Sequence, residues 1–325
     1  MTEQLSEQVA VDAGGTRTRA VVLDPAGHCL GYAVAGSGNP IAVGPETAAA
    51  SVAQSVTAAL AQADVPSTRV RSVVLAMAGA GSRAVAAEVS ARLAGLGAPV
   101  VFESDLLATF CSGTHLADGY AVISGTGAGA IRVEDGRQVA VADGLGWLLG
   151  DEGSGFWIGP RVVRAALADL DGRGPATALT PLVLARLGVA APSDAGDREP
   201  IIAVVRALYD GPPVRLADYA RLVFEVAGDG TATRILDEAA AALERTLTAV
   251  RSPALSGPLV LGGGILGHGD QLVDRLVAAR DAAEVHVVGD GTLGVTVLAL
   301  RRVGTDVDAS MFQRLTASLT AVRCR

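Results

Sequence analysis

Lysine is absent from this chain of 325 residues, because all 26 of its basic residues are arginine. A Walker A loop requires a lysine for the β- and γ-phosphates, and a protein kinase requires one on its third strand. Schiff-base catalysis also requires an amine. These three chemistries are therefore excluded. The 34 acidic residues give a net charge of −8, and without a basic run the chain is not expected to bind nucleic acid.

Aromatic residues, cysteines and long apolar runs are also scarce. Only 3% of the residues are aromatic, so the core must consist mainly of Ala, Val and Leu. No apolar run approaches the roughly 18 to 20 residues that a membrane-spanning helix requires. Cys29, Cys111 and Cys324 are odd in number and far apart, which argues against a disulfide framework. Residues 1–7 are polar, unlike a signal peptide. We therefore expect a cytoplasmic α/β protein without a structural metal or a membrane partner.

Glycine is abundant, with 40 residues, and two of its clusters each lie between apolar segments. The first cluster, Gly14-Gly15, separates the expected strands 8–12 and 18–24. The second, Gly125-Thr126-Gly127, separates the expected strands 119–124 and 129–133. The order strand, glycine turn, strand predicts a hairpin in both places. Two such hairpins about 110 residues apart indicate a duplicated architecture.

Apolar periodicity predicts the remaining helices and strands. Helices are expected over 45–63, 83–93, 105–111, 151–168, most of 201–249, 271–279 and, as the last one, 294–302. Strands are expected over 30–34, 70–76, 99–102, 138–141, 259–261 and 285–288. Residues 171–197 have loop composition in places.

The first glycine turn can bind an anion. Glycines let backbone amides approach a phosphate closely, and Asp12 stands at the carboxyl end of its strand, where it can hold a hydrated Mg²⁺ near that phosphate. An ordinary hairpin turn next to an aspartate fits the same residues. The turn alone leaves both interpretations open.

The second glycine turn is close to a dinucleotide-binding fingerprint, since Gly129 also follows at the right spacing. That fingerprint must open a helix, whereas a strand follows here, so a hairpin is favoured. Two facing glycine hairpins would grip the β- and γ-phosphates of a nucleotide from opposite sides. A third cluster, Gly262-Gly263-Gly264, can let adenine or ribose lie against the backbone, or can be a simple strand-to-helix turn.

Two acidic positions offer further chemistry. Asp105 begins a helix, where an aspartate commonly serves as the N-cap. It can also be a general base that accepts a hydroxyl proton during phosphoryl transfer, a reaction that needs positioning, Mg²⁺ and one carboxylate. In the segment 144–155, the acids can cap the next helix or bind sugar hydroxyls. Trp147 in that segment can be core or pocket wall.

The ordered set of motifs, over nearly the whole chain, resembles the N-acetylglucosamine kinase branch of the BadF/BadG/BcrA/BcrD-type ATPases, within the actin-like superfamily. The motifs are Asp12-Ala-Gly-Gly-Thr-Arg-Thr18, Ser37-Gly-Asn-Pro40, Ala78-Gly-Ala-Gly81, Ser104-Asp105, Ser124-Gly-Thr-Gly127, Gly150-Asp-Glu-Gly-Ser154 with Trp157, and Leu261-Gly-Gly-Gly264. The resemblance implies an α/β fold of two ribonuclease-H-like (actin-like ATPase) domains with a cleft between them. It assigns 1–117 plus 290–325 to the N-terminal domain and 118–289 to the C-terminal domain.

The same resemblance implies an ATP-dependent kinase, dimeric and dependent on Mg²⁺ near Asp12, that phosphorylates N-acetylglucosamine. Asp105 then looks like the base that deprotonates the sugar 6-hydroxyl. Asn39, Asp151 and the loop Gly144, Leu145, Gly146 look like sugar contacts. The implied ATP contacts are Gly14, Gly15, Thr16, Arg17, Thr18, Gly125, Thr126, Gly127, Gly262, Gly263 and Gly264.

The chain departs from the family pattern in one loop. Family members commonly read Gly-Gly-Trp-Gly where this chain has Asp143-Gly144-Leu145-Gly146, so N-acetylglucosamine, glucosamine and N-acetylmuramic acid all stay open as substrates. A different class of function is an ATP-driven activator of a partner protein. The three cysteines do not supply the iron–sulfur motif of such activators, nor the zinc cluster of another bacterial glucokinase family. A sensor that binds sugar without phosphorylating it would not need Asp105.

Overall fold

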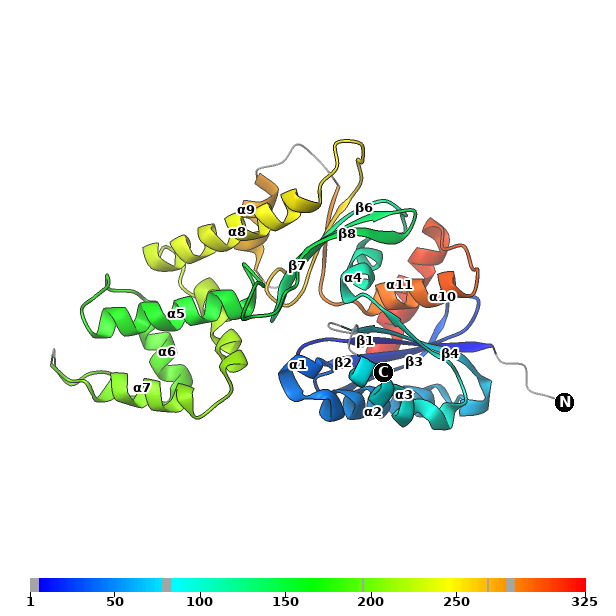
Figure 1. The fold of residues 1–325 in the computed structure, drawn as a ribbon, viewed down its shortest axis with the longest axis horizontal. Helices are drawn as coiled ribbons and strands as arrows, with labels where there is room; N and C mark the ends of the chain where they lie inside the picture. The colour runs from blue at the N-terminus through cyan, green and yellow to red at the C-terminus, as the bar shows by residue number, and fades with distance from the viewer. Residues whose placement is uncertain (1–5, 78–82, 195, 268, 279–283) are drawn as a thin grey trace.

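The computed structural model describes residues 6–77, 83–194, 196–267, 269–278 and 284–325, and it contains two five-stranded sheets (Figure 1). The motif at residues 78–81 therefore lies outside the described residues. In this described part of the chain, no helix is both long enough and apolar enough to cross a bilayer.

The two sheets have the same topology. The first has the order β3-β2-β1-β4-β5, and the second has the equivalent order β8-β7-β6-β9-β10. In each sheet the three strands that come first in the chain are antiparallel neighbours. The other two strands run parallel to the central strand, which is β1 in the first sheet and β6 in the second. The predicted duplication is confirmed. The strands are β1 (Glu7–Ala13), β2 (Thr18–Leu23), β3 (Cys29–Ala35), β4 (Val70–Met77), β5 (Val100–Glu103), β6 (Gly119–Ser124), β7 (Ala128–Glu134), β8 (Arg137–Asp143), β9 (Leu259–Gly262) and β10 (Val285–Val288).

The helices follow the expected order with four differences. The α-helices are α1 (Pro40–Val43), α2 (Pro45–Ala63), α3 (Arg83–Leu93), α4 (Asp105–Gly113), α5 (Gly155–Leu170), α6 (Leu179–Leu187), α7 (Glu199–Tyr209), α8 (Gly230–Val250), α9 (Asp270–Ala278), α10 (Thr292–Arg302) and α11 (Ala309–Arg323). Short 3₁₀ segments are η1 (Ser67–Arg69), η2 (Ala94–Leu96) and η3 (Pro213–Phe224). Helix α1 forms where no helix was expected, α6 interrupts a region expected to be partly loop, and α11 follows the helix expected to be last. Helix α5 begins four residues later than expected.

Helices cover both faces of the first sheet, which explains why β1 is buried along its whole length. Val9 and Val11 share a buried cluster with α2 on one face. Ala10 points to the other face, where it shares a cluster with α10. Alternation along a strand therefore sends successive residues into two different cores.

Between the two sheets lie α4 and α10, which pack against each other (Figure 1). Helix α10 contacts β1, β2 and β4 of the first sheet, whereas α4 contacts β6, β7 and β9 of the second. One buried cluster therefore includes Val74 of the first sheet, Phe110 of α4, Val260 of the second sheet and Val295 of α10. Helix α11 packs against β3, so the C-terminal segment lies against the first sheet.

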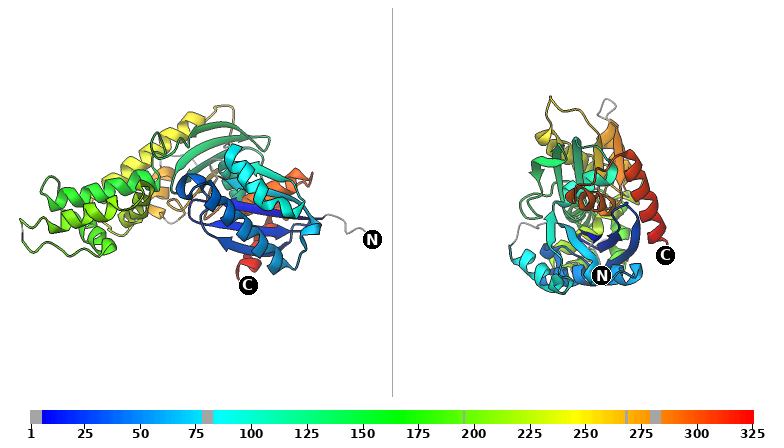
Figure 2. Two further views of the ribbon diagram at one scale, coloured as in Figure 1. Left: turned by 60° about the horizontal axis from the view of Figure 1, so that its bottom comes forward. Right: turned by 90° about the vertical axis from the view of Figure 1, so that its right-hand side faces the viewer.

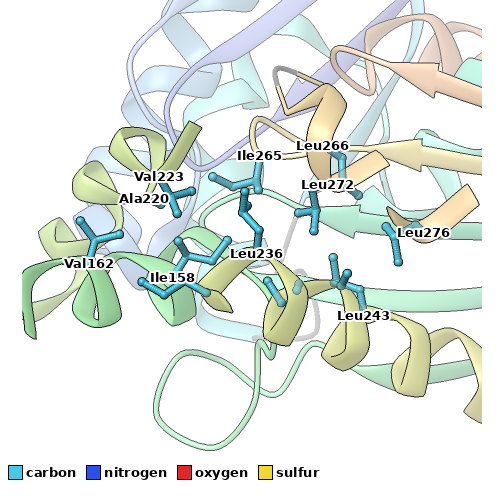
Figure 3. Close-up of a cluster of buried hydrophobic side chains, with 14 of the residues drawn as sticks. Ile158, Val162, Ala220, Val223, Leu236, Leu243, Ile265, Leu266, Leu272 and Leu276 are labelled. Atoms are coloured by element: carbon cyan, nitrogen blue, oxygen red, sulfur yellow. The ribbon is translucent and has the colours of Figure 1, made fainter. Parts of the chain in front are cut away.

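Helices α5, α6 and α7 extend away from the sheets (Figures 1 and 2). The largest apolar cluster joins the base of this extension to the second sheet (Figure 3). In that cluster Ile158 of α5 lies with Val223 of η3, Leu236 of α8 and Ile265 after β9. The cluster fixes the chain after β9 relative to α5, and both of these segments contribute to the site described next.

Candidate nucleotide and sugar site

The two glycine turns face each other across the two halves of the protein. The β1–β2 turn is closed by a hydrogen bond from the Gly14 amide to the Arg17 carbonyl oxygen (3.0 Å). The β6–β7 turn is closed from the Gly125 amide to the Gly127 carbonyl oxygen (2.9 Å). A Cβ atom placed on Gly15 would lie 2.9 Å from Thr126 Oγ1. The structure therefore brings the two turns together, and a side chain at Gly15 would fill the space between them.

The other residues of the first turn divide into an exposed tip and a buried base. Thr16 and Arg17 are exposed at the tip. Thr18 is fully buried, and its hydroxyl donates to the Gly36 carbonyl oxygen (2.9 Å). The Thr18 side chain therefore holds the turn to the segment after β3.

That segment carries Asn39. Ser37 Oγ donates to the Gly15 carbonyl oxygen (2.8 Å), and the Gly38 amide donates to the Gly14 carbonyl oxygen (3.1 Å). Asn39 is the N-cap of α1, where its Oδ1 accepts from the Ile41 amide (2.9 Å). The predicted sugar contact is thus anchored beside the first glycine turn.

The third glycine cluster lies partly at the second turn. Gly263 has a φ of +92°, and a Cβ there would lie 2.6 Å from the carbonyl of Ser124, which also accepts from the Ile265 amide (2.9 Å). Only glycine allows this close approach of two backbones. A Cβ on Gly125 would lie 3.6 Å from the Gly264 amide nitrogen. Gly262 differs, because it is buried in β9 with its α-carbon facing Thr109 of α4.

Asp12 is buried at the end of β1 beside a chain of charged groups. Its Oδ2 accepts from the Gly291 amide (3.1 Å) and lies 3.5 Å from Arg19 Nη1. Arg19 Nε lies 3.5 Å from Asp290 Oδ2, and Asp290 also pairs with Arg323 of α11 (2.7 Å). Burial raises the pKa of Asp12 to about 7, and the charge of Asp290 adds to the rise while Arg19 opposes it.

Asp12 suits a magnesium ion held mainly by water and phosphate. No group of three or more metal-ligating side chains occurs in the described part of the chain. Mg²⁺ keeps several waters and commonly uses only one or two carboxylates together with substrate phosphates. Burial disfavours the ionised form of the Asp12 carboxyl and raises its pKa, and a nearby cation would favour the ionised form. The residues therefore fit the ion.

Asp105 is not the helix N-cap. Ser104 holds that position, and its Oγ accepts from the Leu107 amide (3.4 Å). The half-buried Asp105 carboxylate accepts from the adjacent Leu106 amide (3.0 Å). Burial raises the pKa of Asp105, while that hydrogen bond opposes the rise. Since Ser104 supplies the cap, Asp105 is available for another role.

Asp151 lies against the second glycine turn. Its Oδ1 accepts from the Ala128 amide (3.2 Å), and a Cβ on Gly127 would lie 2.8 Å from its Oδ2. Asp151 does not cap α5 either, because Ser154 is the N-cap and accepts from the Trp157 amide (3.1 Å). The nearby carboxylates of Asp12 and Asp151 both have raised pKa values, mainly through burial, and in both the charge of Asp105 adds to the rise. The charge of Asp105 therefore acts on both Asp12 and Asp151, which lie on separate elements.

Most of this arrangement lies within one family match, although Asp290, Gly291 and Arg323 follow its last residue. The model of the BadF/BadG/BcrA/BcrD ATPase family matches residues 9–287, which include both glycine turns, Asp105 and Asp151. The chain belongs to this family. The resemblance inferred from the ordered motifs is thus confirmed.

Two proteins of similar sequence are named as amino-sugar kinases. Glucosamine kinase GspK of Vibrio cholerae is 34% identical over 182 residues, which are 54% of this chain and 60% of that protein. The match therefore spans less than two thirds of GspK. N-acetyl-D-glucosamine kinase of Dictyostelium discoideum is 27% identical over 318 residues, which are 90% of this chain and 97% of that protein.

Solved structures confirm the predicted fold class. A candidate N-acetylglucosamine kinase from Chromobacterium violaceum has a TM-score of 0.74 at 26% identity and covers 91% of this chain and 99% of its own. A ROK family glucokinase from Streptomyces griseus, solved with glucose and AMPPNP, has a TM-score of 0.57 at 20% identity, with coverage of 91% and 99%. At that identity the second likeness shows the fold alone, which is the two-domain α/β fold of these kinases.

In this ATPase-family chain Gly144 is exposed and Gly146 is half-buried, with φ of +71° at Gly144 and +83° at Gly146. Leu145 between them is 66% exposed. Trp147 is half-buried and packs against Phe156 with ring centroids 5.0 Å apart. Trp147 therefore serves as a packing residue at the start of α5, and Leu145 is the apolar residue that the loop presents to solvent.

Sequence reasoning missed Arg19, Asp290 and Gly291. Arg19 lies in a segment whose apolar residues predict only a strand. Asp290 and Gly291 indicate only the start of a helix. No local signal could pair Gly291 with Asp12, since 279 positions separate them.

Proposed function

We propose that the protein is an ATP-dependent amino-sugar kinase that transfers the γ-phosphate to the 6-hydroxyl of N-acetylglucosamine. The observation that carries this proposal is that two glycine turns face each other, with Asp12 on the strand before the first and Asp151 against the second. The charge of Asp105 acts on both of these carboxylates. The names of the relatives support an amino sugar as the acceptor, with glucosamine and N-acetylmuramic acid as the alternatives within the class.

In this proposal the two glycine turns bind the phosphates, and Gly263 and Gly264 face the adenosine. Mg²⁺ near Asp12, when bound, neutralises charge on the phosphoryl oxygens. Asn39, Asp151 and the 144–146 loop position the sugar. The sugar hydroxyl oxygen bonds to the γ-phosphorus, its proton passes to Asp105, and the bond from that phosphorus to ADP breaks.

The decisive test is release of ADP from MgATP in the presence of single hexoses. The panel contains N-acetylglucosamine, glucosamine, N-acetylmuramic acid, N-acetylmannosamine and glucose, with a no-sugar control. We expect one amino sugar to raise the rate far above the control, and its 6-deoxy analogue to leave the rate at the control level. Equal ADP release in every reaction would instead indicate an ATPase that acts on a partner protein.

Asp12→Asn is expected to raise the Mg²⁺ concentration needed for half-maximal turnover by about 10- to 100-fold, the scale for carboxylates that act on a metal through an intervening group. Asparagine keeps an oxygen for the Gly291 amide but loses the charge that attracts the ion. The measurement is a Mg²⁺ titration of ADP release at saturating ATP and sugar. The control is Asp64→Asn, an exposed residue after α2 whose φ of +53° asparagine tolerates. An unchanged Mg²⁺ requirement in Asp12→Asn would remove Asp12 from the metal site.

A further inference from the structure

A single carboxylate closes the loop that precedes α5. Asp143 is the last residue of β8, and its Oδ1 accepts from the Asp151 amide (2.7 Å) while its Oδ2 accepts from the Glu152 amide (2.8 Å). The Leu145 amide also points to Oδ1, at 3.5 Å. Both ends of the loop are therefore joined through one side chain.

The backbone around this carboxylate is unusual. Asp143 has a φ of +62° and Asp151 a φ of +56°, in the left-handed region that aspartate tolerates better than most residues other than glycine. Gly150 packs so closely on Asp143 Oδ1 that a side chain there would overlap it. The carboxylate is thus an integral part of the loop.

The closure also fixes the position of Asp151. Its amide is bound by Asp143, and its own carboxylate is bound by the Ala128 amide next to the second glycine turn. The Gly144 amide donates to the Ala128 carbonyl oxygen (2.9 Å), which ties the start of the loop to the same residue. Asp143 and Ala128 therefore hold Asp151 from its two sides.

In the middle of the loop, Trp147 packs against Phe156, but the two leucines that follow it lie largely in solvent. Leu148 and Leu149 are 76% and 78% exposed. The Leu149 and Gly150 amides donate to the Gly146 carbonyl oxygen, and both of these bonds lie within the loop itself. Without Asp143, ordering of this segment would have to accompany sugar binding, and binding that must also order a loop is weaker.

We propose that Asp143 is a positioning residue for the sugar: by binding both ends of the 144–152 loop, it holds Asp151 and the Gly144–Gly146 backbone in their binding arrangement before the sugar arrives. This inference rests on the proposed function, in which those residues contact the sugar. Asp143 itself need not touch the substrate. It acts on affinity for the sugar and leaves the phosphoryl-transfer step to Asp105.

The test uses two substitutions of Asp143. One removes all of its side-chain acceptors, and the other keeps one acceptor oxygen. Asp143→Gly makes the φ of +62° easy but removes every acceptor, so the KM for the sugar should rise about tenfold or more, the scale of one hydrogen bond to a charged group. The kcat and the KM for ATP should stay within about twofold of wild type. Asp143→Asn keeps one acceptor oxygen and should give an intermediate KM.

The control is Asp135→Gly. Asp135 is an exposed aspartate with a φ of +51° in the β7–β8 turn, so the same substitution relaxes the backbone without touching the loop. Its KM for the sugar should equal that of wild type. Circular dichroism of all variants checks that they are folded.

The outcomes separate the two proposals. If no hexose stimulates ADP release by the wild-type protein, the proposed function fails, and the role of Asp143 fails with it. If wild type is stimulated and Asp143→Gly keeps the wild-type KM for the sugar, the positioning role alone is wrong. A matching rise in both KM values, or no rescue by Asn relative to Gly, would also overturn it, because a general loss of structure would have that signature.

Discussion

Asp105→Asn is expected to lower kcat by about 100-fold or more while leaving the binding of ATP and sugar close to wild type, the usual result of removing a general base. The amide has nearly the same size as the carboxylate and keeps an oxygen for the Leu106 amide. It cannot accept the hydroxyl proton. Because Ser104 caps α4, the helix start does not depend on residue 105. Steady-state ADP release measures kcat, and equilibrium binding of ATP and of the sugar measures the two affinities.

The matched control is Asp270→Asn. Asp270 is the first residue of α9, as Asp105 is the first of α4, but it is exposed. Its kcat should stay at the wild-type value. Thermal unfolding should show Asp105→Asn to be at least as stable as wild type, because the change removes a charge that burial disfavours. Wild-type turnover in Asp105→Asn would exclude Asp105 as the base.

The pH dependence of kcat follows from the same burial. The pKa of Asp105 is raised, and the base acts only when it is deprotonated. Activity is therefore present when the pH is above the pKa of Asp105 in the folded protein, and it is lost as the pH falls through that pKa. The acidic limb of the pH–rate profile should lie above the pH at which an ordinary aspartate titrates. A limb at the ordinary aspartate pKa would contradict the burial of this group in the working enzyme.

Local patterns in the sequence were sufficient for most of the fold. The bounds predicted for the helix 45–63 agree with those of α2, and both glycine turns form the predicted hairpins. A hairpin depends on residues that are neighbours in sequence, and a helix on spacing within a few turns. These features need no knowledge of the rest of the chain.

The sequence predictions failed where contacts between distant parts of the chain determine the structure. Helix α11 is held by Leu315, Leu319 and Val322, whose partners lie on strands at the other end of the chain. Their i, i+4, i+7 spacing was a usable signal for a helix. The choice between N-cap and general base for Asp105 was open in the sequence, because aspartate commonly caps helices. Only the backbone position of the first helical residue shows that Asp105 is not the cap.

Gly294→Ala is expected to destabilise the protein, although alanine is the better helix former by about 1 kcal/mol. Gly294 lies in α10 where this helix crosses α4. A Cβ there would overlap the carbonyl oxygen of Ala108 and lie 2.7 Å from the Ser112 amide nitrogen. Both are backbone atoms of a buried helix and cannot move aside as a side-chain tip can. Overpacking of this kind costs about 1 to 3 kcal/mol and occasionally more, which exceeds the gain in propensity.

The crossing of α4 and α10 also connects the stability of the protein to its chemistry. Asp105 is the first residue of α4, and Gly291, which donates to Asp12, is the N-cap of α10. Forcing the two helices apart would shift the base relative to Asp12, so Gly294→Ala should lower both the unfolding temperature and kcat. The control is Gly230→Ala at the start of α8, where a Cβ meets nothing within 4 Å and stability should be unchanged or slightly higher. Wild-type stability and turnover in Gly294→Ala would mean that the two helices do not approach this closely, and the shared core between the sheets would need a different explanation.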